Sequence, residues 1–530
     1  MASDSKTKKI DSDKQDLDID EVNRSLQLIA KGTGIILIGT LIGTILAAIF
    51  PIVIARYYTP TEFGIYALAM TVFLFLTQIS YLGLDDGCPR NIALYRGRKD
   101  SDKVGHVIIS TFEFIMISGF IASVILFLSA DWISLTIFKT VELARPLRLM
   151  SFAVPFWLLI GTIVSIYRGF DRSKESVYFN SLLLQGVKIF FALPVIIFGL
   201  SFDYIFYAIT INIIVVFLVA AIYYQRRKPQ KLNLKKSKSP IKKELLFFSL
   251  PLVFSGMSWF LLQATDKFMI GFSMTEYNVG LYNSACTVSM YLNIFLVSVM
   301  FIYQPVGTKL FGAGKNLELK KLYQTITKWI FLAASPLIML VFLQPNFVIS
   351  FLFGKQYLGS VVPLSILFLT YAIRICLGPA GGSVIMLGKT KQLMYIVAGI
   401  AFMNIALNYF LIPIYGITGA AIATGASIIT LSILEVGYLY KISNIQPMKK
   451  LYLKIMSVFL FLMAIMYLVF QYVPIQFSMF TRILLIILSY LLFFILLIVF
   501  NLFRKEDLLL IEMVEQKIGR KIPLVRRIIR

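Results

Sequence analysis

Apolar runs of about 20 residues recur along almost the whole chain, and they constrain its fold more than any other feature. As a helix, a run of this length crosses a hydrocarbon core of about 30 Å. The chain of 530 residues is 58% hydrophobic and has a mean hydropathy of +0.82. This is too apolar for a water-soluble domain with a polar surface. The sequence therefore predicts an all-α integral membrane protein.

Fourteen transmembrane helices are predicted from the apolar runs and the polar segments between them. The first thirty residues are polar and mixed in charge, so we expect no cleaved signal peptide. The predicted spans are residues 33–56, 62–84, 106–130, 148–167, 177–200, 203–224, 246–272, 278–304, 324–345, 362–386, 393–413, 418–440, 452–473 and 481–503.

The distribution of lysine and arginine supports this helix count. If the N-terminus is cytoplasmic, the inward loops hold 26 of these residues and the outward loops hold three. Cytoplasmic loops of membrane proteins carry an excess of lysine and arginine. A wrong number of helices would assign later loops to the wrong side and remove this difference. We expect a multi-pass protein of the cytoplasmic cell membrane with both termini inside. The net charge of +24 then indicates orientation and lipid contact rather than nucleic-acid binding.

The two halves of the membrane region resemble each other. Residues 54–76 align without gaps on residues 270–292, and eight of the 23 pairs are identical, including Gly64 with Gly280. An offset of six helices preserves the membrane orientation, so a pseudo-twofold axis along the membrane normal is expected, with the substrate pathway between the halves. Coincidence among apolar residues is the alternative.

The predicted domain organisation follows from this repeat. The two six-helix bundles are related in parallel, and a helix pair is added at the C-terminal end. The predicted parts are a cytoplasmic segment with a short interfacial helix (1–31), the N-terminal bundle (32–224), a basic cytoplasmic linker (225–245), the C-terminal bundle (246–441), the additional helix pair (442–503) and a basic cytoplasmic tail (504–530).

Three motifs in order along the chain resemble those of a known family. They are "TPTEFGIYALA" (59–69), "TDKFMIGFSMTEYNVGLYNSA" (265–285) and "NYFLIPIYGITGAAIAT" (408–424). With fourteen spans, they resemble the O-antigen-type polysaccharide-biosynthesis flippases of the multidrug/oligosaccharidyl-lipid/polysaccharide (MOP) exporter superfamily. The residues that match the second motif are Asp266, Lys267, Gly271, Gly280, Leu281 and Tyr282.

The resemblance implies export of an oligosaccharide linked to polyprenyl phosphate or diphosphate by alternating access, without enzymatic activity or a cofactor. The partners it implies are the lipid-linked substrate, membrane lipids, a coupling H⁺ or Na⁺, and glycan-assembly proteins. A cation-coupled multidrug exporter of the same superfamily is one alternative, although such exporters typically have twelve spans. A degenerate, non-transporting scaffold is another.

A membrane oligosaccharide polymerase or ligase is the alternative from another class. Such an enzyme would need a sizeable outer loop with catalytic acids or histidine, and the longest predicted outer loops here have about 17 residues without such a set. No metal site is expected, because Cys88, Cys286 and Cys376 show no paired spacing and are interpreted as packing residues.

Charged residues deep inside predicted spans are candidates for function. A charge at a helix centre costs roughly 2.5–3.5 kcal/mol on insertion scales, so it is retained where it serves a purpose. Arg374 and Lys188 each lie about eleven or twelve residues into a span, roughly 17 Å from the nearer helix end. A cationic cavity would suit a diphosphate-sugar headgroup. A structural pair with a buried acid is the alternative for both.

Asp266 and Lys267 are adjacent, so they point about 100° apart on a helix and do not neutralise each other. Lys267 and Arg56 are candidates for the substrate cavity. Asp266 is a candidate coupling site for a proton or sodium ion, or a gate that pairs with a cation such as Arg56. Glu113 and Glu435, near the cytoplasmic face, are weaker coupling candidates.

Polar residues elsewhere complete the set of candidates. Asn404 and Asn408 lie one turn apart on one helix face, and Asn293 lies in the eighth span; their amides suit sugar hydroxyls or contacts between helices. The inner-mouth cations either recruit an anionic headgroup or serve as ordinary positive-inside residues, which we favour. They are Arg90, Arg96 and Arg168.

Overall fold

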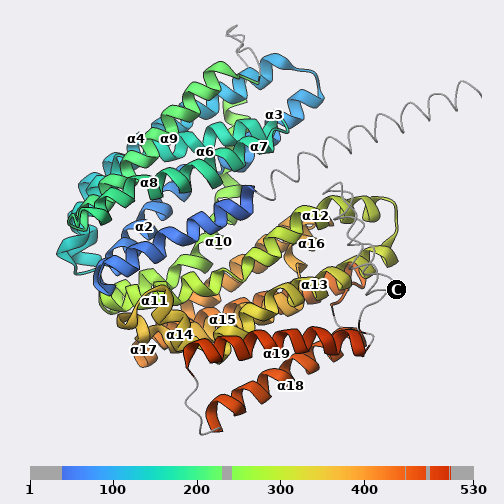
Figure 1. Cartoon of the computed structure of the whole chain (residues 1–530). Coiled ribbons are helices and arrows are strands. Elements are labelled where there is room, and N and C mark those ends of the chain that lie inside the picture. Colours follow the sequence, from blue (N-terminus) through green and yellow to red (C-terminus); the bar gives the residue numbers. More distant parts are fainter. Residues whose placement is uncertain (1–38, 230–240, 448, 473–477, 501, 503–530) are drawn as a thin grey trace, which may run out of the picture.

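The protein is built of helices that form two groups side by side (Figure 1). The computed structural model describes residues 39–229, 241–447, 449–472, 478–500 and 502. Within these ranges there is no β-strand. The N-terminal helices, coloured blue to green, form one group, and the C-terminal helices, coloured yellow to red, form the other (Figure 1). The predicted all-α class is confirmed.

The N-terminal bundle contains six predicted spans, several of which are broken into shorter helices. Its helices are Gly39–Tyr57, α2 (Pro60–Ser80), α3 (Leu84–Gly97), α4 (Ser101–Trp132) with π-helix η1 (Ile133–Ile137), 3₁₀-helix η2 (Val141–Leu143), α5 (Ala144–Ser151), α6 (Val154–Gly169), α7 (Ser173–Ser176), π-helix η3 (Val177–Leu183), α8 (Leu184–Ile197) and α9 (Asp203–Arg226).

The C-terminal half contains the second bundle and the additional helix pair. The pair packs on α13, because the Phe331 ring meets the rings of Tyr452 and Phe459. The helices are α10 (Ile241–Ser273), α11 (Glu276–Met290), α12 (Asn293–Gly312), α13 (Asn316–Leu343), α14 (Pro345–Leu352), 3₁₀-helix η4 (Lys355–Ser360), α15 (Val361–Leu377), α16 (Ala380–Met386), α17 (Thr390–Ser443), α18 (Lys450–Tyr472) and α19 (Met479–Val499).

The number of spans agrees with the prediction of about fourteen. Within the described residues, 12 helices are long and apolar enough to cross a membrane, or 13 if the pair Val141–Ser151 and Val154–Gly169, bent by 48°, is one span. α17 has 54 residues, about 80 Å at 1.5 Å per residue, which is more than twice a hydrocarbon core. Its backbone breaks at Gly416, at φ 57° and ψ −137°. It therefore corresponds to the two predicted spans 393–413 and 418–440.

The helices are longer than the predicted spans, so two predicted loops are largely helical. Predicted loop 85–105 is helical up to Gly97, and predicted loop 306–322 is helical except for 313–315. Hydropathy detects only the apolar part of a helix. A helix that continues into polar residues keeps its backbone hydrogen bonds, so its true ends lie beyond the apolar run.

α10 contacts both bundles. Its first half packs on α3, where Ser249 is fully buried against two glycines. A Cβ built on Gly83 would lie 2.1 Å from the Ser249 carbonyl oxygen, and one on Gly87 would lie 2.0 Å from its hydroxyl oxygen. The second half of α10 packs on α17. The first helix of the predicted C-terminal bundle therefore also packs against the N-terminal bundle.

Gly64 of α2 and Gly280 of α11 meet where the bundles touch. These are the residues that the sequence repeat pairs. A Cβ on Gly64 would lie 1.8 Å from the Glu276 carbonyl oxygen, and one on Gly280 would lie 1.9 Å from that of Pro60. The helices therefore cross backbone to backbone, and repeat-related residues face each other, as a twofold relation requires.

Three predicted segments lie wholly or mostly outside the described residues. They are the N-terminal segment with its interfacial helix (1–31), the centre of the basic linker (230–240 of 225–245) and the basic tail (504–530).

Candidate functional site

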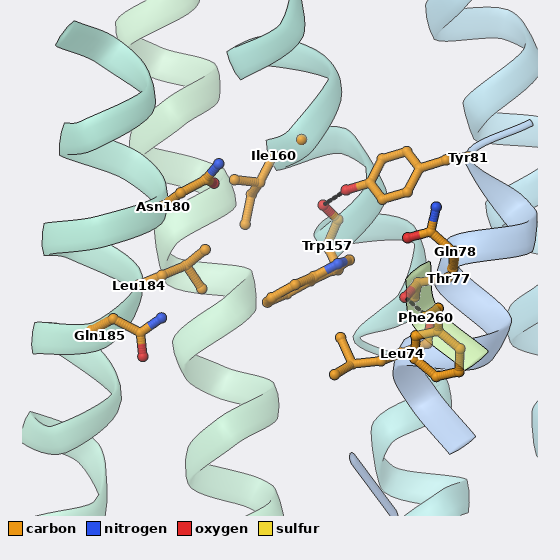
Figure 2. A pocket seen from close by; sticks show the side chains of 11 residues that line it. Leu74, Thr77, Gln78, Tyr81, Trp157, Ile160, Asn180, Leu184, Gln185 and Phe260 are labelled. Atoms are coloured by element: carbon orange, nitrogen blue, oxygen red, sulfur yellow. Dashed lines mark hydrogen bonds between the residues drawn. The ribbon is translucent and has the colours of Figure 1, made fainter. Parts of the chain in front are cut away.

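A cavity of about 390 Å³ lies in the N-terminal half, and the sequence analysis did not anticipate it. Figure 2 shows that α2 supplies one wall, that η3 and α8 supply the opposite wall, and that Trp157 of α6 lies between them. We call it the amide cavity, because the side-chain amides of Gln78, Asn180 and Gln185 contribute to its lining. These amides lie in predicted spans and carry no charge that would mark a site in the sequence. The lining residues are Leu74, Thr77, Gln78, Tyr81, Trp157, Ile160, Gly161, Asn180, Leu184, Gln185 and Phe260.

Asp266 lies in the C-terminal half, with only 2% of its surface exposed. One carboxylate oxygen accepts a hydrogen bond from the Tyr282 hydroxyl at 2.5 Å. The other accepts one from the Asn408 amide at 3.1 Å. Helices α10, α11 and α17 thus converge on a single carboxylate, and a buried acid with such partners is well positioned.

The amides behind Asp266 extend the network. Asn408 also donates to the side-chain oxygen of Asn404 at 3.1 Å, and Asn404 donates to the Thr424 hydroxyl at 3.2 Å. Within the described residues, the side-chain oxygen of Asn408 is buried without a hydrogen-bond partner. We call Asp266, Tyr282, Asn404, Asn408 and Thr424 the Asp266 cluster.

A small cavity of about 20 Å³ adjoins the Asp266 cluster. Asp266, Thr424 and the half-buried Lys267 line it together with Cys286 and Tyr371. A cavity needs roughly 10–15 Å³ to hold one water, so this space is large enough for a single water. The oxygen atoms around it are ligands that hard cations prefer.

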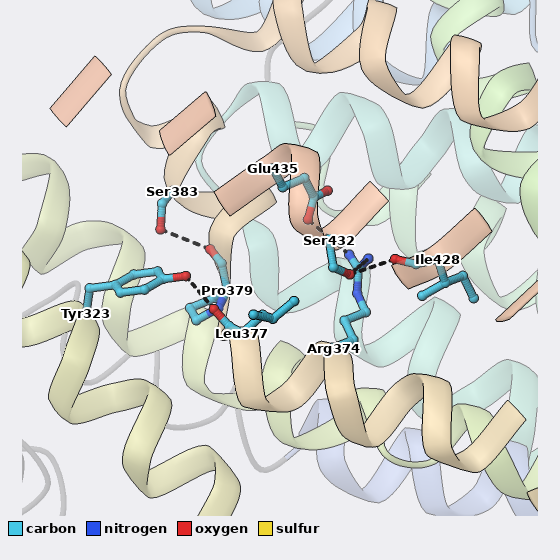
Figure 3. A network of polar contacts seen from close by, with 8 residues as sticks. All are labelled: Tyr323, Arg374, Leu377, Pro379, Ser383, Ile428, Ser432 and Glu435. Atoms are coloured by element: carbon cyan, nitrogen blue, oxygen red, sulfur yellow. Dashed lines mark hydrogen bonds and ion pairs between the residues drawn. The ribbon is translucent and has the colours of Figure 1, made fainter. Parts of the chain in front are cut away.

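The half-buried Arg374 and the buried Glu435 form an ion pair, 3.6 Å between guanidinium nitrogen and carboxylate oxygen. Figure 3 shows the pair beside the break between α15 and α16. Arg374 also donates to the Ser432 hydroxyl at 3.2 Å. The Glu435 side chain is 3% exposed, and a Cβ built on Gly381 would lie 2.5 Å from its second oxygen. A candidate substrate residue and a candidate coupling residue are therefore partners.

The break beside this pair is closed by side chains. Gly378, at φ 79°, ends α15. Tyr323 of α13 donates to the carbonyl oxygen of Leu377 at 2.7 Å, and Ser383 donates to that of Pro379 at 2.9 Å (Figure 3). The freed carbonyl of Leu377 is thereby satisfied, as non-helical backbone at membrane depth requires, and the Pro379 carbonyl also accepts from the Ser383 backbone amide at 3.1 Å.

Comparison with known proteins agrees with this architecture. The family model described as "Polysaccharide biosynthesis protein" matches residues 53–362. The chain belongs to this family. The family's match ends at the start of α15, so the fold of the whole chain is established by other comparisons.

Two relatives of this polysaccharide-biosynthesis protein are similar in sequence. The capsular polysaccharide biosynthesis protein CapF of Staphylococcus aureus is 25% identical over 289 residues, which are 49% of this chain and 69% of CapF. The uncharacterized membrane protein MJ1068 of Methanocaldococcus jannaschii is 22% identical over 465 residues, covering 81% of this chain and 88% of that protein.

Two solved structures have the same fold as this family member. The lipid II flippase MurJ in an inward closed conformation is 18% identical, with a TM-score of 0.70, covering 86% of this chain and 97% of MurJ. An inward-facing multidrug resistance MATE transporter of the MOP superfamily is 18% identical, with a TM-score of 0.62, covering 75% of this chain and 94% of that one. The chain therefore shares the fold of these two proteins.

The other predicted site residues of the family member are spread over the two halves. Lys188 of α8 lies over the Phe50 ring, with its amine 4.4 Å from the ring centroid. Arg56 is exposed and donates to the carbonyl oxygen of Phe351 at 2.6 Å. Arg56 therefore contacts α14 in this structure. It is not a partner of Asp266, which bonds to Tyr282 and Asn408.

Two further candidates belong to neither polar cluster. Glu113 of α4 is exposed and forms an ion pair with Lys242 of α10 at 2.5 Å, which connects the N-terminal bundle to the following helix. Asn293 is the half-buried first residue of α12. Neither is a member of the Asp266 cluster or of the ion pair at Arg374.

The three inner-mouth arginines already have protein partners. Arg96 pairs with Asp171 at 2.9 Å, and Arg168 pairs with Asp86 at 3.0 Å. The Arg90 guanidinium lies 3.9 Å from the centroid of a phenylalanine ring of α10. These contacts connect α3 to α6 and α10, which agrees with a structural duty.

Sequence reasoning identified the charges of the polar clusters and the amides of Asn404 and Asn408, but it missed the other neutral members. Tyr282 was noted only within the family motif, and Thr424 and Ser432 were not singled out. Gln78, Asn180 and Gln185 of the amide cavity were also missed. The available signal was an uncharged polar residue inside an apolar run, which is common enough in membrane helices to carry little weight.

Proposed function

We propose that the protein moves a lipid-linked oligosaccharide, carried on a polyprenyl phosphate or diphosphate, from the inner to the outer leaflet. The match to the polysaccharide-biosynthesis family over residues 53–362 is the observation that carries this proposal. Membrane-buried polar groups in both halves support it, because such groups mark substrate and ion pathways. The MOP-superfamily fold of the chain agrees with transport by alternating access.

Apart from the contacts of α10, the contacts between the halves at one end of the molecule support an inward-facing state. The Gly64–Gly280 crossing, the Arg56 bond to Phe351 and a 3.2 Å bond from Gln356 to the Tyr58 carbonyl all join the halves there. In the orientation that the loop charges predict, this end faces outward.

Cysteine labelling from both sides would test the orientation in the cytoplasmic membrane: a cysteine within 225–245 is expected to react only from the cytoplasm.

The flippase proposal is tested with the full-length protein in proteoliposomes. The probe is a polyprenyl diphosphate bearing a disaccharide with a fluorescent label on the sugar, and an impermeant reductant quenches the outer-leaflet label. Movement of this probe across the bilayer supports the proposal. A protein that moves no sugar-bearing lipid but exports an organic cation would instead be the multidrug exporter. Covalent extension or transfer of the saccharide would indicate the polymerase or ligase.

We further propose that a monovalent cation at the Asp266 cluster couples to transport. The carboxylate, the unpartnered Asn408 oxygen and the adjoining space of about 20 Å³ support this role. Replacing Na⁺ by choline, and separately removing the pH gradient, distinguishes sodium from proton coupling. Asp266→Asn is expected to abolish the dependence on the coupling ion.

The matched control is Asp171→Asn, which alters a carboxylate that is 85% exposed. It should leave ion dependence unchanged. If Asp266→Asn retains the wild-type dependence on both Na⁺ and pH, the coupling role of Asp266 is wrong, whereas the flippase proposal stands or falls with the movement of the sugar-bearing probe.

A further inference from the structure

We propose that the amide cavity binds an uncharged sugar ring of the lipid-linked substrate. This inference rests on the proposed function and adds the chemical class of the headgroup: neutral sugars rather than acidic ones next to the lipid phosphate. The cavity of about 390 Å³ lies between helices of the N-terminal bundle and Phe260 of α10 (Figure 2). Its volume falls in the lower part of the range of about 300–1,000 Å³ for small-molecule sites.

The cavity offers hydrogen bonds without charge. None of its 11 lining residues is acidic or basic. Among the described residues, the side chains of the half-buried Gln78 and Gln185 and of the exposed Asn180 make no hydrogen bond, and the Gln185 side-chain oxygen is buried without a partner. A buried amide without a partner costs free energy unless a ligand or water satisfies it. Each amide both donates and accepts, which matches the paired donor and acceptor of a sugar hydroxyl.

Aromatic rings supply the other half of sugar recognition. Trp157, Tyr81 and Phe260 all contribute to the lining. The Tyr81 hydroxyl donates to the Trp157 carbonyl oxygen at 3.3 Å, so one ring is held in place (Figure 2). A pyranose presents an apolar face of C–H groups, and flat aromatic rings with a polar tip pack against such a face. A cationic drug would instead need an acidic residue in the wall.

Two glycines give the cavity its walls. A Cβ built on Gly161 would lie 2.1 Å from the Tyr81 hydroxyl oxygen. One built on Gly256 of α10 would lie 2.4 Å from the Gln78 amide nitrogen. The Tyr81 and Gln78 side chains therefore occupy space that is free only because residues 161 and 256 are glycines.

A lysine lies near the position that the lipid phosphate of a bound substrate would take. Lys188 comes three residues after Gln185 on α8, about one helical turn or 4.5 Å along the axis. Residues with this spacing share a helix face. The first sugar of the substrate is bonded to phosphate, so a sugar at Gln185 brings the phosphate within reach of the Lys188 side chain.

The test measures binding to the full-length protein in nanodiscs. The probes are three polyprenyl diphosphates with the same prenyl chain: one without sugar, one with N-acetylglucosamine and one with glucuronic acid. The wild type should bind the neutral-sugar probe about tenfold more tightly than the bare lipid, the effect of one or two net hydrogen bonds. Gln185→Leu and Asn180→Leu should remove this preference and leave binding of the bare lipid unchanged.

Two glycine variants separate the cavity from a general effect on the fold. Gly161→Ala should reduce the preference, since its methyl group displaces Tyr81. Gly186→Ala is the matched control on α8, because a Cβ there meets nothing within 4 Å. It should retain the full preference. Thermal unfolding of each variant verifies that the protein is folded.

The outcomes distinguish this inference from the proposed function. Equal affinity of the wild type for the bare and neutral-sugar probes, or tighter binding of the glucuronic acid probe, would overturn the neutral-sugar site. So would an equal loss of bare-lipid binding in Gln185→Leu. A wild type that prefers the neutral sugar but moves no sugar-bearing lipid in proteoliposomes would contradict the flippase proposal instead.

Discussion

The two bundles share a scaffold but hold their polar groups differently. In the C-terminal bundle two acids are buried and have partners within the protein, Asp266 with Tyr282 and Glu435 with Arg374. In the N-terminal bundle the deep polar groups are neutral amides around a cavity and the lysine Lys188, and ion pairs such as Arg96 with Asp171 and Arg145 with Asp203 lie near the helix ends. One half thus has the chemistry of an ion site, whereas the other has that of a neutral ligand site.

The largest expected effect comes from breaking the buried pair. Glu435→Ala leaves Arg374 as an unpaired charge, which should lower the free energy of unfolding by about 3–5 kcal/mol. Denaturation in detergent micelles measures it. The matched change in the N-terminal half is Asp171→Ala, which breaks an exposed pair with Arg96 and should cost about 1 kcal/mol or less. Equal losses would remove the contrast between the bundles.

A double variant then separates stability from function. Arg374→Met with Glu435→Leu should regain most of the stability lost in Glu435→Ala, because apolar residues can replace a buried pair at little cost. Transport of the labelled sugar lipid should nevertheless stay low if the pair serves substrate or coupling. Full transport by the double variant would show that the pair is purely structural.

Adding a methyl group where the bundles touch should have an intermediate effect. Gly280→Ala places a Cβ 1.9 Å from the Pro60 carbonyl oxygen, and such overpacking costs about 1–3 kcal/mol. Because the clash exists only when this end is closed, the outward-open population should rise. Spin labels at the exposed Tyr57 and Tyr277 would report a longer distance.

The control for this change is Gly399→Ala in α17, whose Cβ meets nothing within 4 Å. It should leave the distance distribution as in the wild type. An unchanged distribution in Gly280→Ala would mean that the closed end absorbs the methyl group, and that the crossing does not limit the closed state.

Among the changes inside the membrane region, the smallest expected stability effect is at Lys188. Losing its contact with the Phe50 ring in Lys188→Met should change stability by about 0.5–2 kcal/mol. Binding of the bare polyprenyl diphosphate should fall, and Lys188→Arg should restore it, since both side chains offer a cation to phosphate. Wild-type binding by Lys188→Met would assign the lysine to packing alone.

The sequence predicted the membrane fold well because hydropathy and loop charge act through the bilayer, a solvent common to all such proteins. It also indicated that Gly64 and Gly280 are equivalent, although not that they touch. The partners of Arg374 and Asp266 were beyond it, since Glu435 and Asn408 come from helices distant in the chain. The amide cavity was missed because neutral amides in membrane helices are usually contacts between helices.

The crossing at Gly64 and Gly280 also bears on how such a protein can evolve. Peptide groups, not side chains, form the nearest contact there, so the fit does not depend on which residues surround it. Sequence drift elsewhere can remake the substrate site of either half while the meeting point keeps its shape. Because each glycine faces the backbone of the other half, a larger residue at either position would displace both halves.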